Sequence, residues 1–296
     1  MHVGREILDL ARAAGAKTTF VVGIGKNVGK TVTMRAIYEA ACDRELCVGV
    51  ASIGRDGEAV DAGDAAPKPR IFLRRGTLFA TAREALPRSP AVELVALSSL
   101  RTAAGALLYA RVAQGAYYEL VGPPTASGVR EVVDELNARC ETTVVDGAID
   151  RVAAVAGIPG AIVVAAGASA AGTVREAADA VAGLVRRLSV AQYDGREDAV
   201  YIDGAFTATR AARLIAARES RQIVLRDPTQ IALSGKAASN AFVRLRIRCL
   251  RPLNVVAVTV ASIGRERSFE PRAFAQAVAE AAGLPTFDVY AGERAA

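Results

Sequence analysis

Short apolar runs of strand length alternate along the chain with longer stretches in which apolar residues recur every three or four positions. The runs at 18–22, 142–145 and 161–166 have the length of buried strands, whereas 29–42 and 271–282 have the spacing of amphipathic helices. Strands that alternate with helices pack as a mainly parallel sheet with helices on both faces. The sequence therefore predicts an α/β fold of this architecture.

The same alternation continues through the rest of the chain. The stretch 57–70 is the least patterned part and is expected to form a surface loop. Because no linker rich in Pro, Gly or Ser divides the chain, we expect a single domain over residues 1–296, with a cap inserted at about 57–115. Further strands are predicted at 47–53, 117–121, 200–203, 222–226, 254–261 and 286–290, and further helices at 76–86, 91–113, 128–140, 171–188 and 207–217.

One stretch, 152–174, carries no charge and has the length of a membrane span. It contains four glycines and a proline, and most of its other residues are the weakly apolar alanine. The run AIVVAA at 161–166 is better explained as a strand buried on both faces of a parallel sheet. We therefore predict core structure here and no membrane partner.

Cysteine and histidine usage bears on metal binding and on the compartment. The four cysteines form no C-x-x-C pair, the only histidine is His2, and the opening residues MHVGREI lack the pattern of a signal peptide. These features disfavour a zinc site and predict a protein of the reducing cytoplasm.

The net charge of the 296-residue chain is +6, and its basic residues are spread out except for one group. Arg244, Arg246, Arg248 and Arg251 lie close together, separated by mostly apolar residues, which favours the solvated face of an edge strand or helix over a surface for nucleic acid or an acidic partner. With 8 Phe, 7 Tyr and no Trp, there is also little material for stacking single-stranded nucleic acid. Nucleic-acid binding is therefore disfavoured.

The most informative segment is GIGKNVGKT at 23–31, which follows a predicted strand and opens a predicted helix. Glycines let the backbone wrap an anion with its N–H groups pointing inward, and the helix N-terminus adds a partial positive charge. In such a loop Lys30 would reach the outer phosphates and Thr31 would offer its hydroxyl to Mg²⁺. The residues expected to contact a nucleotide are Gly25, Lys26, Asn27, Val28, Gly29, Lys30, Thr31 and Val32.

The spacing of this segment departs slightly from the usual phosphate-binding pattern, G-x-x-x-x-G-K-[ST], because Ile24 stands where the first glycine belongs. A glycine-rich turn without a ligand is the plainest alternative. A dinucleotide fingerprint beginning at Gly23 and Gly25 would require glycine where Val28 stands and would not use Lys30. The combination of strand, glycines, lysine, threonine and helix favours a phosphate-binding loop, or P-loop, and hence a P-loop NTPase fold.

Acidic residues that follow predicted strands are candidates for holding the metal. Asp146 ends the run TTVVD, as an acidic metal ligand does in many P-loop proteins, although an Asp-Gly turn would have the same sequence. Asp56 is a further candidate metal ligand, or a solvated loop residue. Lys30 and Asp146 are the residues expected to take part in phosphoryl transfer. Because no Asn-Lys-x-Asp motif for guanine is present, we expect ATP rather than GTP.

The hexapeptide VASIGR occurs at 50–55 and again at 260–265, each copy closing a predicted strand. The ends of such strands are where α/β folds place binding loops. No wider repeat surrounds the two copies, which favours coincidence in a chain rich in Ala, Val and Arg.

The loop, with its G-x5-GKT spacing and Val28 before Gly29, resembles those of dethiobiotin synthetase and the cobyrinic acid synthases, in the branch that includes the MinD-type ATPases. This resemblance implies that Lys30 binds phosphate and that Thr31 and Asp146 bind Mg²⁺. Residues 52–56 replace a lysine-containing turn of dethiobiotin synthetase, which argues against carboxylation of a diamine. A MinD-type signature lysine would stand at Gly25, so a MinD-like dimer is not implied.

Over its whole length the chain resembles the small P-loop subunit of the lysine 5,6-aminomutase reactivase. This resemblance implies a chaperone-like ATPase that releases damaged cobalamin from an adenosylcobalamin-dependent aminomutase, together with a companion ATPase. The alternatives are a dethiobiotin-synthetase-like ligase acting on a small amine or carboxylate, and a nucleotide-binding structural subunit without turnover. The segments that carry the likeness are 25–31, 52–56, 68–84, 119–124, 144–151 and 269–289.

Overall fold

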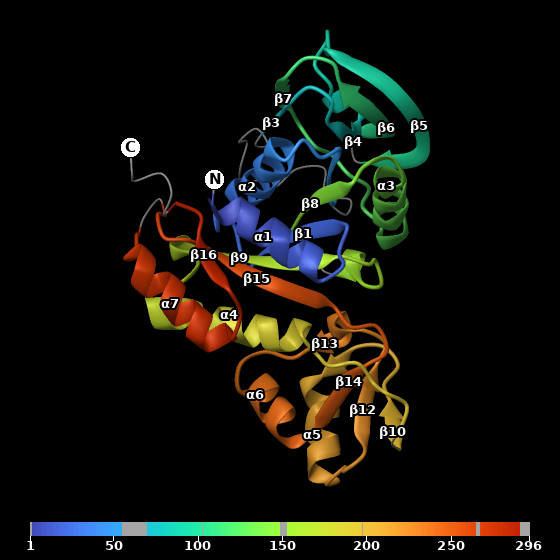
Figure 1. Ribbon diagram of the computed structural model, residues 1–296. Coiled ribbons are helices and arrows are strands. Elements are labelled where there is room, and N and C mark those ends of the chain that lie inside the picture. The colour runs from blue at the N-terminus through green and yellow to red at the C-terminus, as the bar shows by residue number, and fades with distance from the viewer. Residues whose placement is uncertain are drawn as a thin grey trace.

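A computed structural model describes residues 2–54, 70–102, 104–148, 153–196, 198–264 and 267–290, without the side chain of Ala148. Its centre is a nine-stranded sheet with the strand order β16-β15-β9-β1-β8-β2-β4-β6-β5 (Figure 1). The strands from β16 to β4 are all parallel, and β6 and β5 then run antiparallel at one edge. The predicted α/β class with a mainly parallel sheet is confirmed. The strands are β1 (Thr18–Gly23), β2 (Val48–Ser52), β4 (Leu78–Ala82), β5 (Val92–Thr102), β6 (Gly105–Val112), β8 (Thr142–Ala148), β9 (Ala161–Gly167), β15 (Asn254–Ala261) and β16 (Thr286–Asp288).

Helices cover both faces of this sheet, as the alternation predicted. α1 (His2–Ala13) and α2 (Lys30–Asp43) share one buried core with Val21 and Val144 of the sheet. α3 (Ala126–Arg139), α4 (Val174–Leu188) and α7 (Pro271–Ala282) share the core on the opposite face. The centre of the sheet is therefore buried on both sides, and all seven residues of β9 are buried. This confirms the run 161–166 as core, whereas Ser169, Ala170 and Gly172 after β9 are exposed.

The region between β2 and α3 differs from the sequence prediction. Helices were expected at 76–86 and 91–113, but the chain forms β4, β5 and β6 there, with a short 3-10 helix (η1, Arg83–Ala85). A small antiparallel pair, β3 (Ile71–Leu73) and β7 (Ala116–Tyr118), packs nearby. Gly105, with φ +110°, turns the chain between β5 and β6 and would interrupt a helix. The Ala- and Leu-rich composition favours helix locally, and pairing in the sheet overrides that preference.

A separate region lies between α4 and β15 and forms the lower lobe of Figure 1. Its hydrophobic residues, among them Phe206, Ile223 and Leu225, make a core of their own. At β14, an edge strand of the small sheet, the predicted alternation of arginine and apolar residues is confirmed: Ile247 and Cys249 are buried, Arg246 is exposed and Arg248 is half-buried. The elements are a parallel sheet of β10 (Ala199–Tyr201), β12 (Gln222–Leu225) and β14 (Arg246–Cys249), a short pair β11 (Phe206–Thr207) and β13 (Ile231–Ala232), and helices α5 (Ala208–Ala216) and α6 (Gly235–Arg244).

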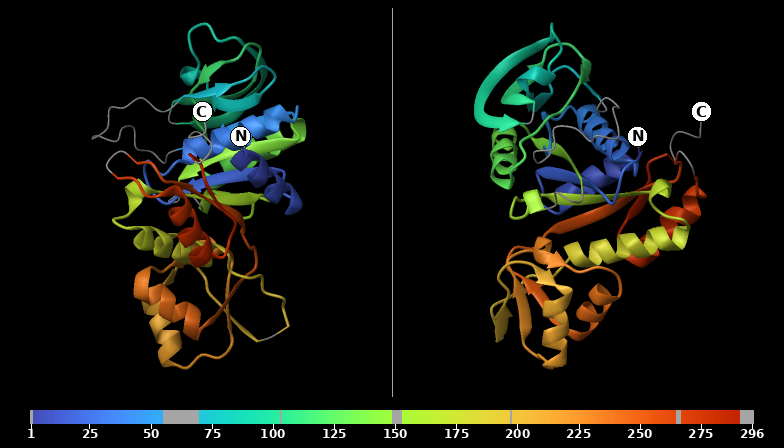
Figure 2. Two further views of the ribbon diagram at one scale, coloured as in Figure 1. Left: turned by 60° about the vertical axis from the view of Figure 1, so that its left-hand side comes forward. Right: turned by 180° about the vertical axis from the view of Figure 1, so that it is seen from behind.

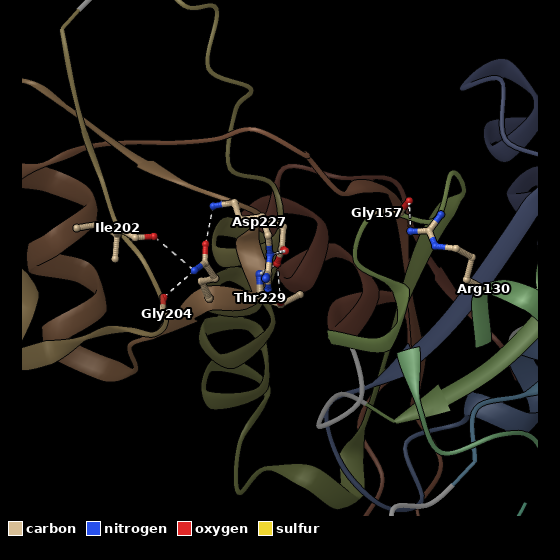
Figure 3. A network of polar contacts seen from close by, with 8 residues as sticks. Arg130, Gly157, Ile202, Gly204, Asp227 and Thr229 are labelled. Carbon is tan, nitrogen blue, oxygen red and sulfur yellow. Dashed lines mark hydrogen bonds and ion pairs between the residues drawn. The ribbon is translucent and has the colours of Figure 1, made fainter. Parts of the chain in front are cut away.

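Polar contacts fix the turn after β12 in this region, as Figure 3 shows. Asp227 is buried and caps a short 3-10 helix (η4, Pro228–Gln230) by accepting a hydrogen bond of 3.0 Å from the amide of Thr229. The Nε of Arg226 donates to the other carboxylate oxygen of Asp227, at 2.9 Å. Asp227 therefore stabilises this turn. Figure 2 shows this lobe and the β4–β6–β5 lobe at opposite ends of the molecule.

A candidate phosphate-binding loop at the centre of the sheet

The glycine-rich segment follows β1, the strand in the middle of the sheet. β1 is buried throughout and pairs in parallel with β8 on one side and β9 on the other. From β1 the chain continues through α2 to β2, which lies beyond β8 in the sheet. From β9 it continues through α4 and later reaches β15, which lies in the opposite direction along the sheet. The carboxyl ends of β1 and β9 thus form a topological switch point, where open α/β sheets form a crevice for ligands.

The backbone of the loop contains two left-handed residues, Asn27 with φ +56° and Gly29 with φ +84°. Asparagine tolerates this conformation better than most residues, and glycine adopts it without strain. The loop also packs tightly: a Cβ placed on Gly167 at the end of β9 would lie 2.8 Å from Cα of Val28. Gly167 was not singled out from the sequence, although a glycine directly after a buried apolar run was the available signal.

Lys30 folds back over the loop that precedes it. Its Nζ donates a hydrogen bond of 3.0 Å to the carbonyl oxygen of Gly25. A Cβ added to Gly23 would lie 2.5 Å from Cδ of Lys30. A side chain at position 23 would displace this aliphatic stem from its place in the structure. The ammonium group therefore lies over the loop, close to the first helical turn.

The N-terminus of α2 is capped differently from those of its neighbours. Thr125, Thr173 and Thr207 cap α3, α4 and α5 by accepting hydrogen bonds from backbone amides, whereas the N-cap of α2 is Gly29, which has no side chain to do so. The first turn of α2 also contains no acidic residue. Its amide groups and the positive end of the helix dipole are therefore available to an anion.

Asp146 lies on β8 beside this loop. It is half-buried and is in register with Val21 of β1 and Ser52 of β2. Because side chains alternate along a strand, Asp146 faces the same side as Val144, the side that α2 covers. The amide of Ile53 donates to its carbonyl oxygen at 2.8 Å. The structure thus brings Asp146 and the half-buried Thr31 of α2 to the same side and the same edge of the sheet.

Asp56, the remaining candidate metal ligand from the sequence, lies outside the described residues. Within the part of the chain that the structure describes, no group of three or more His, Cys, Asp and Glu side chains could hold a metal ion. Mg²⁺ in phosphate sites commonly takes only one or two protein carboxylates or hydroxyls and completes its octahedron with phosphate and water. A Mg²⁺ site of this type would not require three or more such side chains.

The two VASIGR copies lie at the ends of β2 and β15, which are each two strands away from β1, on opposite sides of it. Val50 faces the core that contains α2, whereas Val260 faces the core of α4 and α7, so equivalent residues point to opposite faces. This supports coincidence rather than a repeated binding element. At the second copy, Ala261 packs against the loop, because a Cβ on Gly29 would lie 2.9 Å from its Cβ.

A buried hydrogen bond of 2.8 Å joins the hydroxyls of Thr33 on α2 and Thr259 on β15, so the first turns of α2 are anchored to the sheet beyond β9. Neither threonine was singled out from the sequence. The helix that would carry Lys30 and Thr31 to a phosphate is therefore positioned by strands on both sides of β1.

Comparison with protein-family models, curated proteins and solved structures finds no significant match to this chain. Among the described helices, none combines the length and the apolar character that a membrane crossing requires.

Proposed function

We propose that the chain is a P-loop protein that binds ATP with Mg²⁺ and hydrolyses it. The observation that carries the proposal is the loop between β1 and α2: a glycine-rich turn at the switch point, followed by a helix whose amide groups have no side-chain cap. The strand order around it, with β8 and β9 flanking β1, supports a P-loop NTPase fold.

The residues present fit a nucleotide triphosphate. Gly23 leaves room for the stem of Lys30, and the left-handed Asn27 and Gly29 form a curved backbone of the kind that holds phosphate oxygens. The ammonium group of Lys30 would exchange its carbonyl partner for the outer phosphates. Gly25, Lys26, Val28 and Val32 complete the segment expected to contact ATP.

Chemistry at such a site consists mostly of positioning and charge neutralisation. Bound Mg²⁺ would offset the charge of the phosphates. Thr31 would orient the metal through its hydroxyl, and Asp146 would hold it directly or through water. Lys30 would stabilise the charge that develops on the transferred phosphoryl group.

We further propose that this ATPase acts in the cytoplasm on a partner protein, as a reactivase subunit for an adenosylcobalamin-dependent aminomutase together with a companion ATPase. The resemblance of the whole sequence to the small reactivase subunit supports this role. The lack of a usable histidine or of a nucleophilic cysteine motif also favours a conformational task over chemistry on a small substrate.

The test is ATP hydrolysis by the purified chain with Mg²⁺, alone and with the aminomutase and companion ATPase from the same genome. Stimulation by the mutase complex that is absent in a Lys30→Ala variant is the expected result. ATP that binds tightly without stimulation would contradict the reactivase role and favour the ligase alternative, which a screen of small amines and carboxylates would then examine. Failure to bind ATP at all would contradict the assignment of the loop.

A further inference from the structure

The strand β5 forms one edge of the nine-stranded sheet, because among the residues that the structure describes it pairs with β6 only. It also carries two large apolar side chains in solvent, Leu94 at 56% and Leu97 at 71% exposure. A sheet edge offers unpaired backbone N–H and C=O groups to an added strand, and native proteins commonly shield such edges. Exposed leucines on an edge strand are instead typical of a surface that another chain covers.

An open groove of about 650 Å³ runs between this edge and α3, which lie next to each other in Figure 1. Residues 96–99 of β5 all line it. The pairing of β5 with β6 shifts register between Leu97 and Arg101, so the regular alternation of side chains is interrupted there and four consecutive residues line the groove.

The opposite wall of the groove is acidic. Glu131, Asp134 and Glu135 lie on one face of α3 and line the groove, together with a single guanidinium, that of Arg130. Arg130 is engaged elsewhere, since it donates to the carbonyl oxygen of Gly157. Glu135 is paired with Arg139, whereas Asp134 forms no ion pair with any residue in the described part of the chain. A negative wall of this kind stands out in a chain of net charge +6.

The floor of the groove contains a buried tyrosine hydroxyl. Tyr109 on β6 lies opposite Ala96 and is 3% exposed, and within the described residues its hydroxyl makes no hydrogen bond of ordinary geometry. The neighbouring hydroxyl of Ser98 donates instead to Glu131, across the groove, at 3.3 Å. Burial raises the pKa of Tyr109 to about 12, and the carboxylates of Glu131 and Glu135 add to this rise. The hydroxyl therefore keeps its proton at neutral pH.

We infer that the groove between β5 and α3 binds an extended segment of a partner protein that carries lysine or arginine. The segment would add to the free edge of β5 through backbone hydrogen bonds and cover Leu97, while its basic side chains meet Glu131 and Asp134. A second copy of this chain is a poorer occupant, because two acidic walls would face each other. This inference does not depend on nucleotide binding.

The probe for this site is a short fluorescein-labelled peptide of alternating lysine and valine, and the matched control peptide alternates glutamate and valine. Fluorescence anisotropy of the full chain should show binding of the basic peptide and none of the acidic one. The double variant Glu131→Gln/Asp134→Asn should bind the basic peptide about fivefold more weakly or worse, because two charge contacts are lost. The control variant Asp179→Asn/Glu280→Gln, which removes the same charge from exposed positions on α4 and α7, should bind like the parent.

A second variant separates strand addition from simple charge attraction. Leu97→Lys places a like charge on an exposed position of the edge, so it should weaken the basic peptide about fivefold without changing the thermal unfolding of the chain. Equal binding of the basic peptide to the parent and to both groove variants would overturn the proposal. Competition by free spermine as effective as that by unlabelled peptide, with Leu97→Lys unaffected, would also overturn it and indicate a site for small cations.

Discussion

The Nζ of Lys30 lies 3.0 Å from the carbonyl oxygen of Gly25, so the lysine closes over the loop from which it extends. This contact joins the start of α2 to the far side of the loop without a ligand. We expect Lys30→Ala to reduce ATP turnover on the order of 10²-fold or more, because a positioned charge on the transferred group is lost. The free energy of unfolding should change by less than about 1 kcal/mol, since Lys30 is only half-buried.

The matched control is Lys236→Ala, which also removes one lysine. Lys236 is exposed at the start of α6, in the separate region between α4 and β15. Hydrolysis by this control should equal that of the parent. Undiminished hydrolysis by Lys30→Ala itself would mean that the loop does not hold the phosphates.

Asp146 provides a test of the metal assignment. Asp146→Asn keeps the shape of the side chain and removes its charge, so ATP binding should persist. Mg²⁺-dependent turnover should fall roughly ten- to hundredfold, with a higher Mg²⁺ concentration needed for half-maximal rate. A Mg²⁺ titration of hydrolysis measures both, with Asp179→Asn as the control. An unchanged titration would identify Asp146 as a residue of the Asp-Gly turn only.

The contact between Ser52 and Gly122 permits a prediction about stability. A Cβ added to Gly122 would lie 1.5 Å from the carbonyl oxygen of Ser52, a backbone atom that cannot step aside. Gly122→Ala should therefore lower the free energy of unfolding by about 2 kcal/mol or more. Gly183→Ala, at an exposed position of α4 with open space around it, should raise it by about 0.5–1 kcal/mol. Chemical denaturation measures both, and equal effects in the two variants would contradict this packing.

Two buried thiols make the stability sensitive to alkaline pH. Burial raises the pKa of Cys140 to about 12 and that of Cys249 to about 11, from an ordinary value of 9.0. Because the folded state holds these protons more tightly, their stabilising contribution is complete below about pH 9 and is lost as the pH rises toward 11 and 12. The expected loss is at most about 1.4 kcal/mol per pH unit for each thiol.

Urea unfolding between about pH 8 and about pH 9.5 measures this loss in a range where most tyrosines remain protonated. In the variant Cys140→Ala/Cys249→Ala the unfolding free energy should depend less steeply on pH, whatever its absolute value. An equally steep dependence in the variant would assign the effect to other groups.

The central part of the fold could be predicted from the sequence because its elements are either buried on both faces or strongly amphipathic. The strand 254–261 and the helix 271–282 have the bounds that were predicted. The sequence predicts helices at 76–86 and 91–113 because Ala and Leu are frequent there, and only pairing with β2 and between the strands themselves makes this region a sheet.

The loop of the candidate site was visible because its residues are adjacent in sequence. The contacts that position it were not, since Gly167, Thr259 and Ala261 approach it from strands that begin more than a hundred residues later. The separate core around Phe206 and Ile223 was not predicted either, because its strands are as short as two to four residues and no linker marks its borders.

The place of β1 between β8 and β9 has a consequence for biosynthesis. Thr18 pairs with Thr143, and Thr19 pairs with Ala161, so β1 leaves the ribosome long before either of its partners. During that interval the nascent chain carries an apolar strand with two open edges, which is a site for chaperones or for aggregation. The loop reaches its final geometry only after translation passes β9 and then β15, so a chain that terminates early would contain the whole motif and still lack its scaffold.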